Sequence, residues 1–255
     1  MHNSIIVTGA AQGIGAAVVI QLLKEGYNVI GLDQHPDVEL WQVNQMIMDQ
    51  YKENWHAFAQ DITAFLDTKK LIDQVLKQYH VIALVNVAGI LTMTSLFDAT
   101  LEQWQDSLQV NLLAPIMLSQ QVARHFYANK QGSIVTVSSN SARMPRTQLG
   151  LYATTKAALS HFCRNLALEV APYVRVNIVS PGSTLTQMQK QLWSDDRPPL
   201  AVLEGDLAQF RTGIPLKKLA EPSDIANTIS FLLSPNSAQI TMQEIVVDGG
   251  ATLGV

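Results

Sequence analysis

The chain has 255 residues, of which 47% are hydrophobic and 15% are charged, and its formal net charge is -4. This composition supplies a sizeable core and argues against disorder, and the mild acidity argues against nucleic acid or a membrane surface as a partner. The single cysteine, Cys163, excludes an intrachain disulfide and is expected to be buried, and no signal peptide or apolar run of about 18 residues is visible, so we expect a cytoplasmic protein.

Short β-branched runs alternate with longer helical patterns along the whole chain. Strands are expected at 4–8, 28–33, 55–60, 81–86, 133–137, 174–179 and 244–247. Helices are expected near 13–26, 64–79, 101–128, 150–171 and 223–233. Strands that are apolar throughout are buried on both faces. The alternation therefore predicts an α/β fold, with residues 1–255 forming a single doubly wound Rossmann domain around a seven-stranded parallel sheet.

Two segments break this alternation. Residues 34–54 contain Trp41, Met46 and Met48, and we expect one extra helix there, with these side chains packed in the core. Residues 183–215 are longer and more polar. An insertion of this kind is either a lid over a bound substrate or a plain surface excursion, and the sequence favours neither.

A glycine cluster follows the first strand, in Thr8-Gly9-Ala10-Ala11-Gln12-Gly13-Ile14-Gly15. Glycines at this point allow a tight turn and let the backbone approach a pyrophosphate at the N-terminus of the next helix. The second strand ends at Asp33, whose carboxylate can bind both ribose hydroxyls of NAD and would repel the extra phosphate of NADP. Gln34 and His35 offer no cation for that phosphate. NAD is therefore the expected cofactor, although Asp33 could instead cap the next turn.

Tyr152 and Lys156 are four residues apart and share one face if 150–171 is a helix. A free phenol has a pKa of about 10, and a neighbouring cation lowers it, so Tyr152 is a candidate general acid/base. Ser139 can hydrogen-bond the same substrate oxygen. A tyrosine and a lysine at this spacing occur often in surface helices, so the weight of the motif comes from the cofactor loop upstream.

Together these motifs resemble the short-chain dehydrogenase/reductase family from the first strand to the C-terminus. The resemblance implies that Ser139, Tyr152 and Lys156 are catalytic and that Asn111 supports a proton relay. Asn86-Val87-Ala88-Gly89 is similar to a family motif that has asparagine in its second position. The cofactor contacts that the resemblance implies are Gly9, Gln12, Gly13, Ile14, Gly15, Asp33, Asp61, Ile62, Asn86, Ala88, Gly89, Tyr152, Lys156, Pro181, Gly182, Thr184 and Thr186.

A narrower resemblance comes from residues 180–184, from Met188-Gln189 and Leu192-Trp193, and from residues 213–216, 240–243 and 248–254. They are similar to the subgroup of the family that oxidises 2,3-dihydro-2,3-dihydroxybenzoate to 2,3-dihydroxybenzoate with NAD in catecholate siderophore biosynthesis. Leu185 and Gln187 depart from that pattern, which has acidic residues there. The resemblance implies that Tyr152 takes the hydroxyl proton of the substrate, and it implies a homotetramer.

The carboxylate of such a substrate calls for a cation. Arg146, in the loop between Ser139 and the 150–171 helix, is our candidate because a guanidinium binds a carboxylate through two hydrogen bonds, with Arg143 in reserve. Ser139 and Tyr152 would hold the reacting hydroxyl. Met188, with Gln187 and Gln191, is expected to line the pocket.

Three alternatives stay open. The chain could be another member of the family, either a 3-oxoacyl-thioester reductase or a dehydrogenase of another cyclic or sugar alcohol. It could also be a dinucleotide-binding sensor without catalysis. Asp33 argues against the NADPH-dependent reductases, and the intact catalytic set argues against a sensor. The six histidines show no metal-ligand spacing, and we expect no metal.

Overall fold

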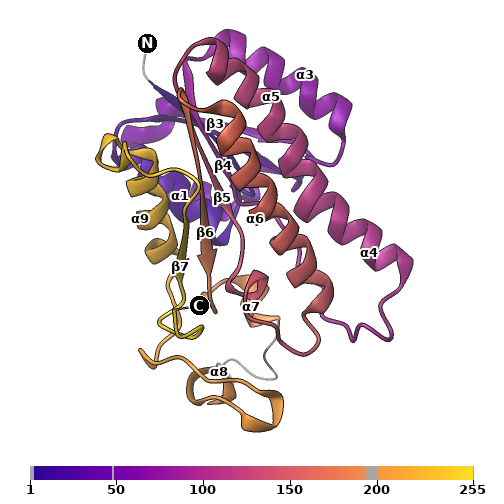
Figure 1. The fold of residues 1–255 in the computed structure, drawn as a ribbon. Helices are drawn as coiled ribbons and strands as arrows, with labels where there is room; N and C mark the ends of the chain where they lie inside the picture. The colour runs from indigo at the N-terminus through magenta and orange to yellow at the C-terminus, as the bar shows by residue number, and fades with distance from the viewer. Residues whose placement is uncertain (1–2, 48, 192, 194–199, 255) are drawn as a thin grey trace.

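The computed structural model describes residues 3–47, 49–191, 193 and 200–254, and it contains one seven-stranded parallel sheet (Figure 1). The strand order is β3-β2-β1-β4-β5-β6-β7. This arrangement confirms the predicted α/β fold, and each strand ends within two residues of its expected position. The strands are β1 Ser4–Thr8, β2 Asn28–Asp33, β3 Trp55–Ala59, β4 Val81–Asn86, β5 Gly132–Val137, β6 Val174–Pro181 and β7 Glu244–Val247.

Helices cover both faces of the sheet (Figure 1). One face carries α1 (Gly13–Lys24) and α9 (Pro222–Leu233), and the other carries α3 (Phe65–Gln78), α5 (Ala114–Ala128) and α6 (Gly150–Val170). Successive strand residues point to opposite faces. Ile5 and Val7 accordingly pack in the core beneath α1, whereas Ile6 packs in the core on the far side. This double burial explains why the strands are apolar at nearly every position.

The helix expected over 101–128 is interrupted. It consists of α4 (Leu101–Leu108), a π-helical turn at Gln109–Leu113, and α5. Pro115 follows directly after the first residue of α5 and has no backbone N–H to donate to the carbonyl of residue 111. The hydrogen-bonding pattern therefore shifts around Asn111, which is completely buried. Single π-helical turns of this kind are frequent at functional sites.

Residues 34–54 hold the one extra α-helix that was expected there, but it is short. The segment holds a 3₁₀ turn at Val38–Leu40, the short helix α2 (Gln42–Met46) and a second 3₁₀ turn at Asp49–Asn54. Trp41 is fully buried as expected, but Met46 is 49% exposed, and Met48 lies outside the described residues. The backbone N–H of Val43 donates to Ala11 in the glycine loop, 3.1 Å away. A continuous helix would have used that N–H internally, so the segment braces the loop instead.

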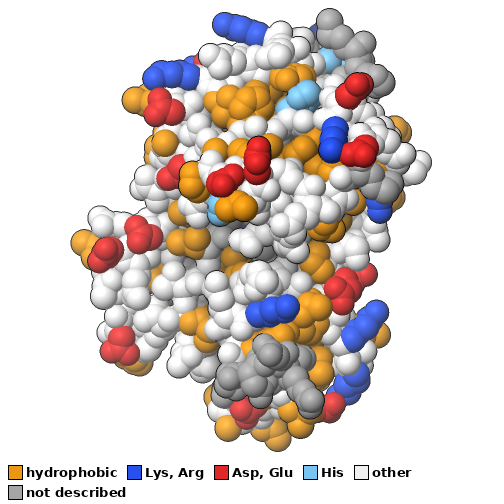
Figure 2. All heavy atoms as spheres, turned by 180° about the vertical axis from the view of Figure 1, so that it is seen from behind, with side chains coloured by type: hydrophobic (Ala, Val, Ile, Leu, Met, Phe, Trp, Pro, Cys, Tyr) orange, Lys and Arg blue, Asp and Glu red, His pale blue; other side chains and the backbone are white. Residues whose placement is uncertain are grey.

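Residues 183–215 contain α7 (Gln187–Lys190), α8 (Leu200–Glu204) and a 3₁₀ turn at Leu207–Gln209, and residues 192 and 194–199 of this insertion lie outside the described residues. Among the helices described, none is long and apolar enough to cross a membrane. On the face shown in Figure 2, acidic and basic side chains are scattered among apolar ones, without a large patch of one sign.

Candidate active site

A cavity of about 800 Å³ opens at the carboxyl ends of the strands. It lies where the strand order reverses between β1 and β4, the position at which open α/β sheets bind ligands. Its volume is that of a cofactor or small-molecule site. The residues expected in the site that line it are Gly9, Gln12, Gly13, Ile14, Gly15, Asp33, Asp61, Ile62, Ala88, Gly89, Ser139, Arg146, Tyr152, Lys156, Pro181, Gly182, Thr184, Thr186, Gln187 and Met188.

Two glycines of the loop, Gly9 and Gly15, are packed too closely against backbone atoms to carry a side chain. Gly9 has a φ of +66°, and a Cβ there would lie 2.9 Å from the backbone nitrogen of Ala88. A Cβ on Gly15 would lie 1.9 Å from the carbonyl oxygen of Gly9. The loop thus brings bare backbone and the N-terminus of α1 to the cavity wall, which suits the pyrophosphate of a dinucleotide.

Thr8 joins the two halves of the sheet and was not recognised from the sequence. Its hydroxyl oxygen accepts hydrogen bonds from the backbone N–H groups of Val87 (3.0 Å) and Ala88 (3.2 Å). These bonds hold the loop after β4 against the loop after β1. A threonine at the end of a buried strand carries no distinct signal, so only the folded arrangement reveals the role.

Asp33 is held in place at the end of β2. Its carboxylate accepts from the backbone N–H groups of Ala11 and His35, each at 3.1 Å. Both the glycine loop and the residue after the strand therefore fix its position at the cavity wall. The described lining beside it, Leu32, Gln34, Gln60 and Asp61, contains no cation.

Asn86 does not reach the cavity, contrary to the role that the resemblance implies for its side chain. It is buried, and its amide donates to the hydroxyls of Ser119 (2.9 Å) and Thr136 (3.2 Å). Since these bonds connect β4 to α5 and β5, the side chain stabilises the sheet. The neighbouring Ala88 and Gly89 do line the cavity.

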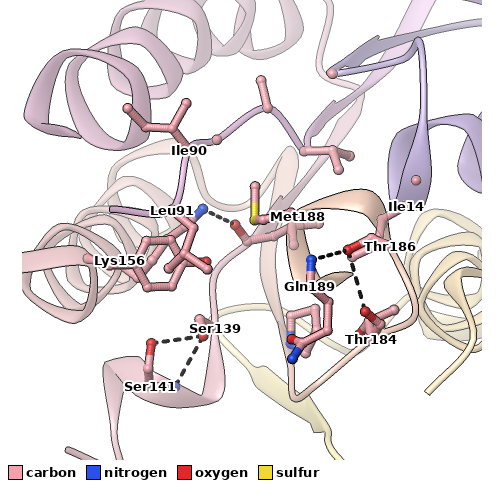
Figure 3. Close-up of a pocket in the computed structure, with 18 of the residues that line it drawn as sticks. Ile14, Ile90, Leu91, Ser139, Ser141, Lys156, Thr184, Thr186, Met188 and Gln189 are labelled. Carbon is pink, nitrogen blue, oxygen red and sulfur yellow. Dashed lines mark hydrogen bonds between the residues drawn. The ribbon is translucent and has the colours of Figure 1, made fainter. Parts of the chain in front are cut away.

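Ser139, Tyr152 and Lys156 come together at the other end of the cavity. Figure 3 shows Ser139 and Lys156 on one side of it and Thr184, Thr186 and Gln189 on the other. Ser139 follows β5, and its hydroxyl oxygen accepts from the backbone N–H (3.2 Å) and the hydroxyl (2.9 Å) of Ser141. Tyr152 comes from the first turn of α6 and lines the same cavity. The Lys156 ammonium lies 5.8 Å from the centre of the Tyr152 ring and donates to the carbonyl of Val137 at 3.0 Å.

The expectation that Lys156 lowers the Tyr152 pKa is not met in this state of the cavity. Loss of hydration raises the pKa of Tyr152 to about 12, and its hydrogen bond with Ser139 opposes this only in part. Burial also lowers the pKa of Lys156 to about 8. Both shifts favour the neutral form of each group, because burial away from water disfavours charge of either sign.

Asn111 lies close to Lys156. Its side-chain oxygen accepts from the N–H of Ile90 (2.8 Å), and its amide donates to the carbonyl of Ile90 (2.9 Å) and the hydroxyl of Thr155 (3.3 Å). A Cβ on Gly89 would lie 3.0 Å from the Asn111 oxygen and 3.3 Å from the Lys156 nitrogen. Asn111 therefore fixes the loop after β4 beside Lys156 without lining the cavity.

The two candidate arginines have different surroundings. Arg146 lines the cavity and donates to the side-chain oxygen of Asn140 at 2.8 Å. Arg143 instead pairs with the buried carboxylate of Glu244 at 3.2 Å, and Arg164 binds the same carboxylate. Arg143 is thus paired with a strand residue outside the cavity lining, and it does not serve as the alternative cation for a substrate carboxylate.

The cavity is also lined by Arg211, which the sequence did not single out, and by Trp193, which the sequence placed only in the narrower resemblance. Gln191, which was expected to line it, is not among the lining residues. Arg211 lies 65 positions beyond Arg146 in a polar insertion, and no pattern in the sequence connects the two. Cys163 is buried as expected, and burial raises its pKa to about 11.

Comparisons with known proteins agree with this geometry. A family model described as enoyl-(acyl carrier protein) reductase matches residues 9–252. The chain is 41% identical over 253 residues to 2,3-dihydro-2,3-dihydroxybenzoate dehydrogenase of Bacillus subtilis (strain 168), covering 98% of this chain and 95% of that protein. It is 40% identical to the protein of the same name in Escherichia coli (strain K12), covering 99% and 98%.

Solved structures give the same grouping. A protein titled "short chain dehydrogenase/reductase family protein" is 28% identical, with a TM-score of 0.81 and coverage of 99% of this chain and 97% of the other. A "4-hydroxyisoleucine dehydrogenase complexed with NADH" is 27% identical, with a TM-score of 0.86 and coverage of 99% and 100%. The sheet, the cavity and these matches lead to one conclusion: the chain belongs to the short-chain dehydrogenase/reductase family of oxidoreductases.

Proposed function

We propose that the protein oxidises 2,3-dihydro-2,3-dihydroxybenzoate to 2,3-dihydroxybenzoate with NAD, as a step in catecholate siderophore biosynthesis. The observation that carries this proposal is the identity of about 40%, over nearly the whole chain, to dehydrogenases named for that substrate. The cavity supports it, because one space joins a backbone cradle suited to a dinucleotide, the Ser139–Tyr152 pair and the guanidinium of Arg146.

The chain's own residues bind and deprotonate the alcohol. Ser139 holds the reacting hydroxyl oxygen, and Tyr152 accepts its proton as the hydride leaves the same ring carbon. The nicotinamide ring, when bound, supplies the hydride acceptor. The resulting ring ketone becomes the catechol by tautomerisation. Because burial raises the Tyr152 pKa to about 12, the phenol is protonated at neutral pH, and kcat/KM for oxidation is expected to rise with pH.

Lys156 and Asn111 complete the proposed catalytic set. The lysine ammonium, fixed by the Val137 carbonyl, would hold the cofactor ribose and stabilise the developing phenolate. Asn111 keeps the Gly89–Ile90 backbone against Lys156 through its two hydrogen bonds to Ile90. Its amide N–H groups donate to Ile90 and Thr155, so its contribution to proton transfer is to position the lysine.

We propose NAD rather than NADP as the cofactor. The support is Asp33, whose carboxylate is fixed by two backbone N–H groups at the cavity wall, with no cation in the described lining beside it. A 2′-phosphate at this position would meet a negative charge, whereas ribose hydroxyls can donate to it. Gly9, Gly13 and Gly15 would hold the pyrophosphate, and the segment from Pro181 to Thr186 would hold the nicotinamide end.

We propose a homotetramer in the cytoplasm, where nicotinamide cofactors are available. Support for assembly comes from large apolar side chains exposed along α4, α5 and α6. They include Leu101 (73% exposed), Met117 (49%) and Leu168 (64%). Apolar rows of this kind on neighbouring helices are suited to packing against other copies of the chain.

The test is an assay of the purified protein with 2,3-dihydro-2,3-dihydroxybenzoate, with NAD and NADP offered in parallel. Formation of NADH together with 2,3-dihydroxybenzoate would establish substrate, reaction and cofactor. Protein that binds NAD but oxidises nothing in this assay would contradict the proposed substrate. Faster turnover with NADP would contradict the role of Asp33.

A further inference from the structure

Arg211 lies in a tight turn that is built before any substrate arrives. The N–H of Asp206 donates to the carbonyl of Arg211 at 2.8 Å, and the N–H of Arg211 donates back to Asp206 at 2.9 Å. Gly205 and Gly213 flank the turn with φ values of +97° and +76°, and a Cβ on Gly205 would lie 2.7 Å from the Arg211 carbonyl oxygen. The turn therefore fixes where the Arg211 backbone lies.

The side chains of this turn are arranged opposite to the usual preference. Leu207 is 93% exposed and Phe210 is 90% exposed, whereas the charged Arg211 is partly buried and lines the cavity. Arginine is mostly exposed in proteins unless it has a partner. Within the described part of the chain, neither Arg211 nor Arg146 forms an ion pair within 4.0 Å.

Arg146 and Arg211 face the same cavity and repel one another. Burial lowers the pKa of Arg146, the positive charge of Arg211 lowers it further, and Asp248 partly offsets both effects. Burial also lowers the pKa of Arg211, and Asp206 opposes this. Two poorly hydrated cations side by side cost free energy, and an anion between them would remove that cost.

A series of hydrogen bonds from Asp248 through Asn140 holds the Arg146 side chain in place. The carboxylate of Asp248 accepts from the side-chain amide of Asn140 (3.1 Å) and from the backbone N–H groups of Gly250 (2.9 Å) and Thr252 (3.0 Å). A carboxylate can only accept, so the amide nitrogen of Asn140 must face Asp248 and its oxygen must face Arg146. Arg146 uses one N–H in this bond and keeps the others for a ligand.

A third donor that lines the cavity also lacks an acceptor. The indole nitrogen of Trp193 is buried and has no hydrogen-bond partner among the described residues, and Trp193 lines the same cavity as the two arginines. Buried donors are nearly always paired. Two guanidinium groups that repel one another and an unpaired N–H in the same cavity call for a group with several acceptor oxygens and a negative charge.

We propose that Arg211 and Arg146 together form the subsite for the ring carboxylate of the substrate, with Arg211 the specificity-determining residue that the 205–213 turn supplies. This inference rests on the proposed function. A carboxylate has two oxygens, so each guanidinium can bind one of them, and charge-assisted bonds of this kind are the strong ones. The same ring without the carboxylate would leave both cations unpaired.

The experiment compares Arg211→Gln with Lys190→Gln, a control that removes one charge from the exposed α7 of the same insertion. kcat and KM are measured with 2,3-dihydro-2,3-dihydroxybenzoate, and calorimetry of the NAD-loaded protein gives Kd for 2,3-dihydroxybenzoate and for catechol. We expect R211Q to raise KM and the Kd for 2,3-dihydroxybenzoate about 10-fold or more, since a charge-assisted contact is lost. The affinities for catechol and NAD should stay unchanged, as should every value for K190Q.

Two results would overturn the inference. One is wild-type protein that binds catechol as tightly as 2,3-dihydroxybenzoate, since no carboxylate subsite would then exist. The other is an R211Q variant that keeps the wild-type preference for 2,3-dihydroxybenzoate. If the wild type fails to oxidise the dihydro substrate, the proposed function falls. The carboxylate subsite would still be supported if the wild type binds 2,3-dihydroxybenzoate more tightly than catechol and R211Q loses this preference.

Discussion

Tyr152 is the residue on which the proposed chemistry depends most directly, because it alone is placed to take the substrate proton. We expect Tyr152→Phe to lower kcat by at least ~10²–10⁴-fold, since proton transfer to a positioned side chain contributes that much. NAD affinity should be unchanged, because the phenol ring is retained. Steady-state kinetics and a fluorescence titration with NADH check both parts. Unchanged turnover would contradict the mechanism.

Lys156 links the site to the pH dependence of stability. Burial lowers its pKa from 10.5 to about 8, so between these values the unfolded chain binds more protons than the folded one. The unfolding free energy should therefore rise with pH across this window, relative to Lys156→Met, by about 1–3 kcal/mol. The unpaired Val137 carbonyl in the variant adds an offset that does not depend on pH. Urea unfolding of both proteins at pH 7.5, 8.5 and 9.5 tests this, and parallel curves would contradict it.

Asp33 is expected to set the cofactor preference. Asp33→Ala should lower the ratio of kcat/KM with NAD to kcat/KM with NADP by about 10-fold or more, because both a ribose contact and a repulsion disappear. Asp37→Ala is the matched control, since it removes an exposed carboxylate from the same segment. A ratio that does not differ between the two variants would remove Asp33 from this role.

At the residue scale, the sequence revealed side chains that belong to ordered motifs and missed those that act through distant contacts. Ser139, Tyr152 and Lys156 lie at a spacing that predicts their proximity on α6 and the end of β5. The raised Tyr152 pKa was not predicted, because it depends on how deeply the folded chain buries the phenol. Arg211 and the Asn140–Asp248 bond were missed for a related reason, since residues 108 positions apart in the latter meet only in the folded chain.

At the scale of single elements, the glycine loop between β1 and α1 is the least tolerant of change. A Cβ on Gly15 would lie 1.9 Å from the carbonyl oxygen of Gly9, a backbone atom that cannot move aside alone. Gly15→Ala should therefore distort the loop and raise the Kd for NAD by at least about 10-fold, which calorimetry measures.

Gly26→Ala is the control for this variant. Its Cβ would meet nothing within 4 Å, although its φ of +85° makes any side chain strained. We expect a loss of about 1 kcal/mol in stability with unchanged NAD affinity. Equal NAD affinities for the two variants would show that the close contact at Gly15 does not shape the cofactor site.

Elements with a clear apolar pattern were predictable, and those shaped by a contact with another element were not. The strands follow from short continuous apolar runs, and α1, α3 and α6 follow from helical patterns. The segment 34–54 is divided because Val43 and Trp41 make contacts with Ala11 and His35 that a continuous helix could not make. The π-helical turn at Gln109–Leu113 comes just before Pro115. This proline lies within the helix expected over 101–128, so the sequence contained a sign of the interruption.

For the whole molecule, the exposed apolar side chains of α5 test the proposed assembly. Met117→Glu would place a charge in an interface between copies and should lower the molar mass measured by light scattering below that of a tetramer. Leu66→Glu on α3 is the control, because Leu66 is 75% exposed on a helix that is not proposed to pack between copies. A tetramer that persists in the Met117 variant would show that this face of α5 is not an interface.

The single hydroxyl of Thr8, which holds the loops after β1 and β4 together, has a consequence for how the family varies its chemistry. The part of the cavity beside the glycine loop is held across the middle of the sheet, whereas Arg211, which we propose binds the substrate carboxylate, comes from an insertion after β6. Exchanging residues 187–215, with Pro181–Thr186 kept in place to hold the nicotinamide end, can change what is oxidised without weakening dinucleotide binding. About thirty residues of one loop are then enough to redesign the substrate range.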